Sequence, residues 1–480
     1  MERIIKHCVN TNETIKTYIE TSKSQNSLAF HIDEQYGKSV HNREFFNRNR
    51  AQDFIDLAVF QATECYDEVV AKDIRFVLNL GTINLSDHVG GIYSPQSFQG
   101  DILYAIMLDE YDVKYIPLCP WGQISLRNST YPRGIAVYES LEAPLKVPVI
   151  KAKYQDMIVP KVPPFGMEEL KAAKDKLSSQ IDDENIKAGV LKFVDDFYAK
   201  ESDASDGYLM QVCRIYQRLS ESVLKSKSFV SLDMTSILRE LLIKDMADED
   251  SLIYKTLYSD VLLKDLIENG LGNSFFDGVD EKGRLFKLSL NEDGKLTGHT
   301  IGGIEYSFDR NEIVNGLVSG EILPGILAAC IMLVYDRGFT WYGGEFSAEY
   351  MSEWRQIYSD GLKKVLNKGL WENSDLQNDC DLQKKIDNIA VDGYLSGPVF
   401  TLCKGTPGHL VEAGPLEFLL NGVDYERCKE RMSYTLYDTH VMNMYEFYND
   451  TTVANEQEDG WYEKITEYYY EKYSNKYCDV

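Results

Sequence analysis

A short polar loop carries residues suited to binding an anionic ligand. Residues 83–101 read INLSDHVGGIYSPQSFQGD and contain His88 beside the adjacent glycines Gly90 and Gly91. A histidine can donate a hydrogen bond to a phosphate oxygen, and glycines let a ligand approach the main chain closely. The loop precedes an apolar helical pattern, and the start of a helix offers free N–H groups and a favourable dipole to anions. These residues therefore predict an anion site.

The elements around this loop predict a parallel β-α-β unit. RFVLNL (75–80) has the apolar character of a strand, FQGDILYAIMLDEY (98–111) that of a helix, and VKYIPL (113–118) that of a second strand. Such a unit is parallel and right-handed in nearly all known cases. Ligands bind outside the carboxyl ends of its strands. We therefore expect the loop and the segment WGQIS (121–125) to face one site.

Side chains after the second predicted strand extend this candidate site. Trp121 and Gln123 offer a ring face and an amide for recognising a base or an amino acid. Arg127 and Arg133 follow, and guanidinium groups bind phosphates or carboxylates at two points, although a surface salt bridge is their commoner role. Asp101, early in the predicted helix, is a candidate for substrate contact or a complement to the helix dipole.

Two later segments place acidic or basic side chains beside glycines. His409 in GTPGHLVEAG follows a strand-like run, and Glu412 comes one helical turn later, so the pair is a candidate for ligand contact. Glu345 in TWYGGEF (340–346) is a candidate base, but an ordinary junction between elements explains that segment better.

The periodicity divides the chain into four expected regions. Residues 1–74 are expected to be helical, and residues 75–165 to hold the first half of a nucleotide-binding core. Residues 166–310 form a helical insertion with a small β-hairpin unit near 284–308, where apolar and polar residues alternate around a turn. Residues 311–480 are expected to be mainly helical and to contain the second half of the core.

The composition restricts the classes of partner. The 480 residues carry a formal net charge of −26, which repels phosphate backbones and argues against DNA binding. Nine scattered cysteines, without a C-x-x-C pair or zinc-like spacing, favour free thiols in the cytoplasm and no metal site. The apolar run 322–335 is too short for a bilayer, so it is expected to be a buried helix, with no membrane partner.

The loop and its surroundings resemble a known family. The segments DHVGG (87–91), Gly100-Asp101 and Trp121-Gly122-Gln123 resemble the HIGH-motif region of class I aminoacyl-tRNA synthetases, nearest the arginyl type. The resemblance implies an α/β fold with a Rossmann-like parallel sheet core, here with large helical additions and a small β insertion. It implies ATP as cofactor, with or without Mg²⁺. It implies nucleotide contacts from Thr82, Asn84, His88, Gly90 and Gly91, catalytic roles for His88 and Arg133, and substrate contacts from Asp101, Trp121, Gln123 and His409.

Two further segments bear on this resemblance. Leu224 to Ser228 (LKSKS) share three of five letters with KMSKS, the second signature of the synthetases. The order of elements is also similar to that of the bacillithiol-synthase family, the cysteine-adding enzymes, on GGIYSP (90–95) and GFTWYGGEF (338–346).

These observations predict one function and leave two alternatives. The expected function is an ATP-dependent ligase or aminoacyl transferase that joins an amino acid to a small-molecule amine or hydroxyl acceptor. An aminoacyl-tRNA synthetase paralogue acting on tRNA is the first alternative, which the acidic composition disfavours. Because Gly91 stands where the synthetase motif has its last histidine, a non-catalytic protein that binds a nucleotide or an amino acid is the second. A homodimer is compatible with the sequence.

Overall fold

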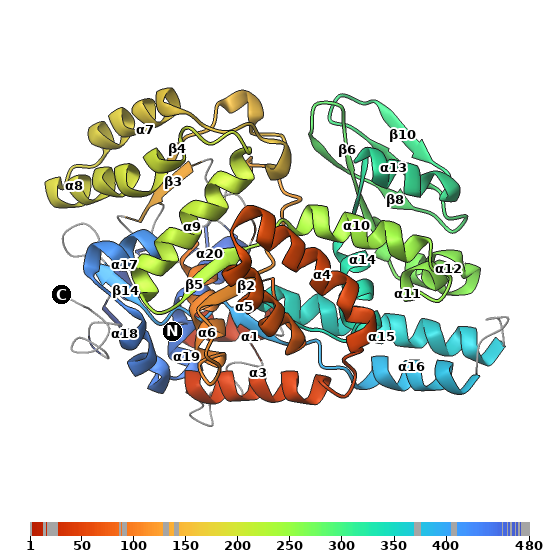
Figure 1. Cartoon of the computed structure of the whole chain (residues 1–480). Helices are drawn as coiled ribbons and strands as arrows, with labels where there is room; N and C mark the ends of the chain where they lie inside the picture. Colours follow the sequence, from red (N-terminus) through yellow and green to blue (C-terminus); the bar gives the residue numbers. More distant parts are fainter. Residues whose placement is uncertain are drawn as a thin grey trace.

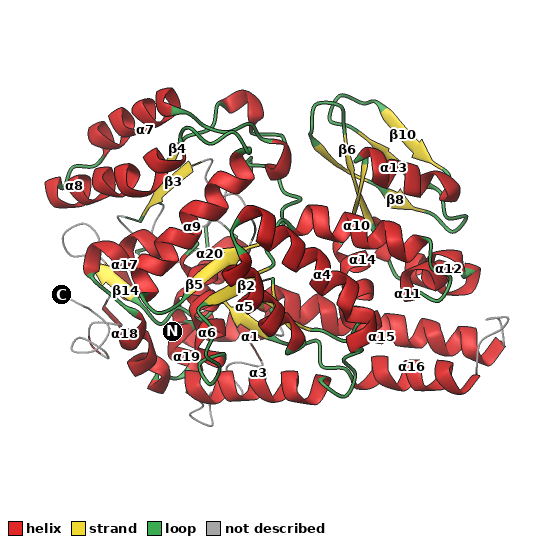
Figure 2. Ribbon diagram, in the orientation of Figure 1, coloured by secondary structure: helices red, strands yellow, loops and turns green. Residues whose placement is uncertain are grey.

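The computed structural model shows a mixed α/β protein in which helices predominate (Figures 1 and 2). It describes residues 2–12, 16, 27–85, 88, 94–127, 134–138, 144–368, 376–404, 410–453, 455–457, 459–460, 463–465, 467–468 and 471. Across these ranges, none of the helices combines the length and apolar character that crossing a membrane requires.

Short parallel strands occupy the centre of the molecule. β1 (Thr82–Asn84) pairs with β12 (Thr340–Gly344), and β12 pairs with β13 (Tyr394–Ser396). β2 (Tyr115–Leu118) pairs with β5 (Ser228–Ser231). The two groups meet where the N–H of Cys119 donates to the carbonyl oxygen of Asn84 at 2.8 Å, and a parallel bridge between His88 and Trp121 continues this contact. The strands therefore lie side by side in the order β5, β2, β1, β12, β13.

Helices cover both faces of these strands. Because successive strand residues point to opposite faces, Phe229 and Val230 enter different hydrophobic cores, as do Tyr342 and Trp341. Phe229 and Tyr342 pack in the core that includes α6 (Pro95–Met107) and α9 (Tyr208–Leu224). Val230 and Trp341 pack in the core that includes α4 (Arg48–Cys65), α5 (Glu68–Asn79), α10 (Met234–Met246) and α15 (Glu345–Lys368).

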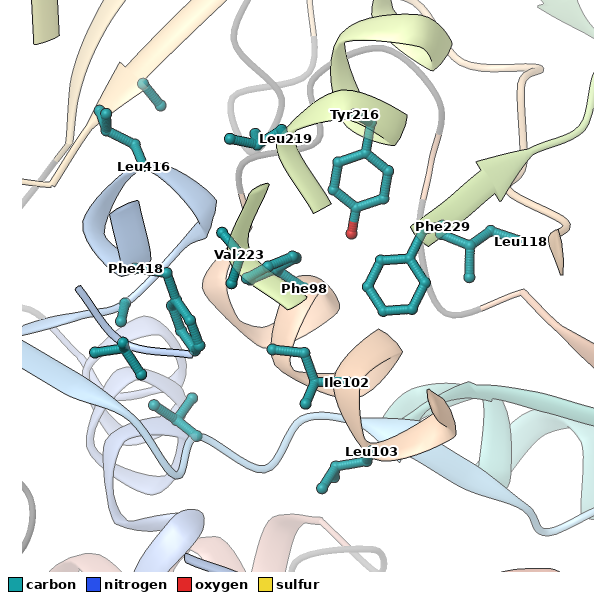
Figure 3. Close-up of a cluster of buried hydrophobic side chains, with 14 of the residues drawn as sticks. Phe98, Ile102, Leu103, Leu118, Tyr216, Leu219, Val223, Phe229, Leu416 and Phe418 are labelled. Carbon is teal, nitrogen blue, oxygen red and sulfur yellow. The ribbon is translucent and has the colours of Figure 1, made fainter. Parts of the chain in front are cut away.

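Aromatic rings pack with aliphatic side chains in the first of these cores, as Figure 3 shows. The ring of Phe98 on α6 meets the ring of Phe418, on α17 (Pro415–Asn421), edge to face with centroids 5.1 Å apart. Tyr216 of α9 stacks on Phe229 of β5 at 5.9 Å. These contacts fix α6 and α9 against the strands.

Helix α6 is also fastened at its start. Gln99 is fully buried, and its amide oxygen accepts hydrogen bonds from the N–H groups of Phe400 and Thr401. Its amide nitrogen donates to the carbonyl oxygens of Thr401 and Ala413. Next to it, a Cβ atom on Gly100 would lie 2.7 Å from the Cα of Ser396, so only glycine lets α6 approach the end of β13 this closely.

An antiparallel β unit, the β insertion, spans residues 276–324 and lies at the upper right of Figure 1. One sheet has the order β11 (Ile322–Pro324), β6 (Phe276–Val279), β7 (Leu285–Lys287). The other has the order β10 (Glu305–Phe308), β9 (Leu296–His299), β8 (Ser289–Leu290), and α13 (Ile313–Ser319) follows it along the chain. The β insertion is followed directly by α14 (Ile326–Cys330) and a π-helical segment, Ile331–Asp336.

The other helices and strands surround these parts. They are α1 (Glu2–Thr11), α3 (Leu28–Asn42), β3 (Gly134–Val137), β4 (Leu145–Pro148), α7 (Met167–Gln180), α8 (Glu184–Phe193), α11 (Leu252–Tyr258), α12 (Asp260–Glu268), α16 (Leu376–Asn388), β14 (Leu402–Lys404), β15 (Leu410–Glu412), α18 (Tyr425–Glu430), α19 (Leu436–Thr439) and α20 (Val441–Thr451).

The prediction of a strand at 75–80 is wrong, because these residues lie at the end of helix α5. The strand is β1, which is three residues long and comes after the helix. Asp67 caps α5 by accepting from the N–H of Val70 at 2.9 Å, and the buried residues Val70, Ile74 and Val77 follow at helical spacing. Gly81, with φ of +79°, then turns the chain out of the helix.

Other expectations are confirmed. The predicted second strand is β2, the predicted crossover helix is α6, and alternating residues at 284–308 form antiparallel strands of the β insertion. The apolar run 322–335 is buried as expected, but its first three residues form β11, and the helix begins only after Gly325. Pro324 pairs with Phe276 at this end of the strand.

Candidate functional site

A pocket of about 590 Å³ opens beyond the carboxyl ends of β1 and β2. One wall follows these strands and consists of His88, Trp121, Gln123, Ile124, Ser125 and Arg127. The other wall comes from the β insertion and its flanks and consists of Asn273, Ser274, Asp277, Leu285, Lys287, Gly325 and Ile326. We call this cavity the carboxyl-edge pocket. It brings together four residues that the sequence singled out, namely His88, Trp121, Gln123 and Arg127.

Local contacts hold the first wall in place. The parallel bridge ties His88 to Trp121, and the N–H of Val159 donates to the carbonyl oxygen of Ile124 at 3.1 Å. A Cβ atom on Gly122 would lie 2.7 Å from the hydroxyl oxygen of Thr235 on α10. Glycine at this position therefore lets the segment after β2 lie directly against α10.

His88 is a neutral side chain in this pocket. Burial of the imidazole lowers its pKa to about 4, and a hydrogen bond with the main chain of Trp121 opposes the shift. At neutral pH the ring therefore donates or accepts hydrogen bonds without carrying a positive charge.

Gln123 presents an unpaired amide at the wall of the pocket. Gln123 is only 3% exposed, and neither its amide oxygen nor its amide nitrogen has a hydrogen-bond partner among the described residues. Leaving a buried polar group unpaired costs about 1–3 kcal/mol. Gln99, by contrast, uses its amide for four hydrogen bonds to the main chain. A ligand group that pairs with the Gln123 amide would remove this cost.

Two positively charged side chains, Arg127 and Lys287, line the pocket. The side chains of Arg127 and Lys287 are 63% and 71% exposed. Arg127 donates through Nη2 to Asp156 at 2.9 Å, and Lys287 donates through Nζ to Asp277 at 2.8 Å. Burial raises the pKa of Asp277, and the charge of Lys287 opposes the shift. The pair of Arg127 with Asp156 is largely exposed and contributes at most about 1 kcal/mol, so Arg127 can turn to an anionic ligand at little cost. Lys287 instead neutralises the buried carboxylate of Asp277, while its own side chain stays open to solvent.

Three other predicted site residues lie deeper and bond to one another or to neighbouring helices. The amide nitrogen of Asn84 donates to Asp101 at 2.9 Å, and the hydroxyl of Tyr216 donates to the other carboxylate oxygen at 2.6 Å. The hydroxyls of Thr82 and Tyr104 lie 2.9 Å apart. Thr82, Asn84 and Asp101 therefore join β1, α6 and α9, and the structure does not bring them into the lining of the pocket.

The remaining candidate positions are Gly90, Gly91, Arg133, His409, Glu345 and Glu412. Gly90, Gly91, Arg133 and His409 are outside the described residues. Glu345 is the first residue of α15, and Glu412 ends β15.

The LKSKS segment lies at the amino end of β5, whereas the pocket opens beyond the carboxyl ends of the parallel strands. Its Lys225 and Lys227 pair with Asp424 and Asp109 at 3.1 and 3.2 Å. The structure therefore does not bring this segment to the pocket.

The second wall of the pocket consists of residues that the sequence does not single out. Asn273, Asp277 and Lys287 carry no motif, and only the pairing of β6 with β7 and β11 brings them opposite His88. In the part of the chain that the structure describes, His, Cys, Asp and Glu side chains form no group of three or more that could hold a metal ion.

Comparison of the chain with protein-family models, with curated proteins and with solved structures finds no match. The basis for a functional assignment is therefore the site itself.

Proposed function

We propose that this chain is an ATP-dependent ligase or aminoacyl transferase that joins an amino acid to a small-molecule amine or hydroxyl acceptor. The observation that carries the proposal is the carboxyl-edge pocket, lined by His88, Trp121 and Gln123 next to parallel strands. Numbered along the chain, the parallel strands have the order 3-2-1-4-5. That order is typical of Rossmann-like sheets, in which ligands bind outside the carboxyl ends of the strands.

The pocket residues suit ATP. Trp121, Ile124 and Ile326 supply apolar surface for a base, and the Gln123 amide supplies an unpaired donor and acceptor for its edge. Arg127 and Lys287 supply positive charge for phosphate oxygens. When bound, ATP would supply an adenylyl group that makes the carboxyl group of an amino acid reactive, and pyrophosphate would be released in this step.

In this proposal the protein acts by positioning and by stabilising charge. The neutral ring of His88 orients a substrate through a hydrogen bond, while Arg127 and Lys287 stabilise negative charge. The β insertion contributes one wall of the pocket, so ATP and the amino acid would be held between the β insertion and the strands.

A small-molecule acceptor fits this pocket better than tRNA. RNA binding depends largely on lysine and arginine side chains that neutralise phosphates. Here the chain has a net charge of −26, and among the described residues that line the pocket only Arg127 and Lys287 carry a positive charge.

The sequence gives one reason for a second candidate, a non-catalytic binding protein. Gly91 occupies the position of the last histidine in the synthetase motif that this loop resembles. A protein of this kind would bind ATP or an amino acid in the carboxyl-edge pocket without turnover.

Pyrophosphate release separates the two candidates. Purified protein would be incubated with ATP and each standard amino acid, alongside the variant His88→Ala and the control Lys192→Ala, whose lysine side chain is 75% exposed. Amino-acid-dependent release that His88→Ala loses and Lys192→Ala retains supports the enzyme. ATP binding without release for any amino acid supports the non-catalytic protein, and absence of both overturns the proposal.

A further inference from the structure

A second cavity, of about 460 Å³, lies away from the carboxyl-edge pocket, between the end of α3 and helix α16. We call it the α3–α16 pocket. The chain from the end of α3 to the start of α4 contributes His41, Glu44, Phe45 and Asn47, and α16 contributes Asp381, Lys384, Lys385 and Asn388.

Most charged groups of this pocket have a partner of opposite sign at its mouth. Lys384 lies 3.7 Å from Asp381, and the ring of His41, which carries a charge only when protonated, lies 3.7 Å from Glu44. These four side chains are between 49% and 69% exposed, so water and salt screen their charges.

Lys385 differs from these groups. Its side chain is half-buried, and within the described ranges no carboxylate lies within 4 Å of its ammonium group. The ammonium instead donates to the main-chain carbonyl oxygen of Asp336 at 2.9 Å. The carboxylate of Asp336 is engaged by Arg50 at 3.1 Å, and it also lies 3.8 Å from Arg337. Among the described residues, Lys385 therefore has no counter-ion of its own in this cavity.

The surroundings make this positive charge unfavourable on its own. Burial lowers the pKa of Lys385 to about 8, Arg337 adds to the shift, and Asp336 opposes it. Asn47, which also lines the pocket, is the N-cap of α4, so the positive end of that helix dipole faces the same region. A negatively charged group in the pocket would offset both effects.

We propose that the α3–α16 pocket binds a small oxyanion, the phosphate or carboxylate group of a small molecule, on the ammonium group of Lys385. The volume of the cavity suits a small molecule. The exposed acids Glu44 and Asp381 at the mouth disfavour a polyanionic partner such as a nucleic acid. This site is separate from the proposed ATP-dependent activity and does not depend on it.

Calorimetric titration tests the proposal directly. Inorganic phosphate and acetate are titrated in separate arms, with sodium chloride holding the ionic strength constant. The wild-type protein should bind at least one of them saturably, and the arm that does so identifies the oxyanion. Lys385→Met should weaken this binding about tenfold or more, because a charge-assisted hydrogen bond is lost. Lys385→Arg retains the charge, and the matched control Lys384→Met removes an exposed, paired lysine. Both should bind within about threefold of the wild type.

A labelling experiment on the wild-type protein avoids any effect of substitution on folding. Lysines are acetylated with acetic anhydride, and the rates at Lys384 and Lys385 are followed by peptide mass spectrometry. A saturating oxyanion should slow the reaction of Lys385 and leave that of Lys384 unchanged. Absence of saturable binding in both titrations, equal binding by Lys385→Met and wild type, or equal slowing of both lysines overturns the proposal.

Discussion

The N–H of Cys119 donates to the carbonyl oxygen of Asn84 at 2.8 Å, and this contact joins two short groups of parallel strands. It lies at the point where β1 and β2 end. Beyond it, His88 and Trp121 form a parallel bridge, and both residues line the carboxyl-edge pocket. Residues that are 33 positions apart along the chain therefore meet at one site because two strands end together.

Replacing Gln123 should affect binding more than stability. In Gln123→Leu, a buried amide without a described partner gives way to an apolar group, so the free energy of unfolding should change by less than about 1 kcal/mol or rise. If the Gln123 amide forms a hydrogen bond to ATP, the affinity of Gln123→Leu for ATP should be about tenfold lower than that of the wild type. Urea unfolding and calorimetric titration measure the two effects.

Gln99→Leu is the matched control for this change. It removes an equally buried amide that makes four main-chain hydrogen bonds, and it should lower the free energy of unfolding by about 3 kcal/mol or more. Equal destabilisation by the two variants would show that Gln123 is a structural residue.

Asp101 should prove to be structural. Its carboxylate accepts hydrogen bonds from Asn84 and from the hydroxyl of Tyr216. Asp101→Asn sets an amide N–H against one of these donors, and the free energy of unfolding should fall by about 1–3 kcal/mol. Tyr216→Phe should then cost less in the Asp101→Asn background than in the wild type, as a double-mutant cycle measures. An unchanged stability with weakened ligand binding would instead make Asp101 a ligand contact.

Arg337 should be one of the most sensitive positions outside the pocket. Its side chain is fully buried and donates to Asp245 at 2.9 Å and to Asp53 at 2.8 Å. Arg337→Met leaves these carboxylates without their main partner, and the free energy of unfolding should fall by about 3–5 kcal/mol. Arg75→Met removes an exposed pair with Asp56 and should cost less than about 1 kcal/mol. Thermal unfolding measures both effects. Equal losses of stability in Arg337→Met and Arg75→Met would contradict the role assigned to Arg337.

Acid should destabilise the fold through His31. Burial, and the nearby His440 and Lys38, lower the pKa of His31 from its usual 6.5 to about 3. Between these values the unfolded chain binds a proton at this residue and the folded chain does not, so the free energy of unfolding falls as the pH falls through this window. His31→Gln removes the contribution. The stability difference between wild type and variant should therefore change by about 1.4 kcal/mol per pH unit between pH 6 and pH 4.

Urea unfolding at several pH values within this window checks the effect. Burial also lowers the pKa of His440 to about 4, so His440→Gln should reduce the pH dependence in the same direction. Wild-type and His31→Gln stabilities that stay parallel across the window would contradict the prediction.

The parts of the fold with a strong local pattern could be predicted from the sequence. Helix α6 and strand β2 are apolar runs of the lengths expected for a helix and a strand, and the rule that parallel strands end at one edge was enough to group His88, Trp121 and Gln123. Strand β1 was misplaced because three residues are too few to show a period, whereas the end of α5 presents an apolar run that looks like a strand.

The parts of the pocket that the sequence does not predict depend on pairing between strands that are far apart along the chain. Lys287 and Asp277 reach the pocket because β6 pairs with β7 and β11, which are separated from β1 by about half the chain. Asp101 has the residue type of a ligand contact, and only the positions of Asn84 and Tyr216 show that its carboxylate is already engaged.

Titration of ATP into the wild-type protein and His88→Ala, with Lys192→Ala as the exposed control, tests the central claim most directly. The account predicts saturable binding at one site, weakened about tenfold or more by His88→Ala and unchanged by Lys192→Ala. The absence of saturable ATP binding, or equal affinities for wild type and His88→Ala, would contradict the assignment of the carboxyl-edge pocket as a nucleotide site.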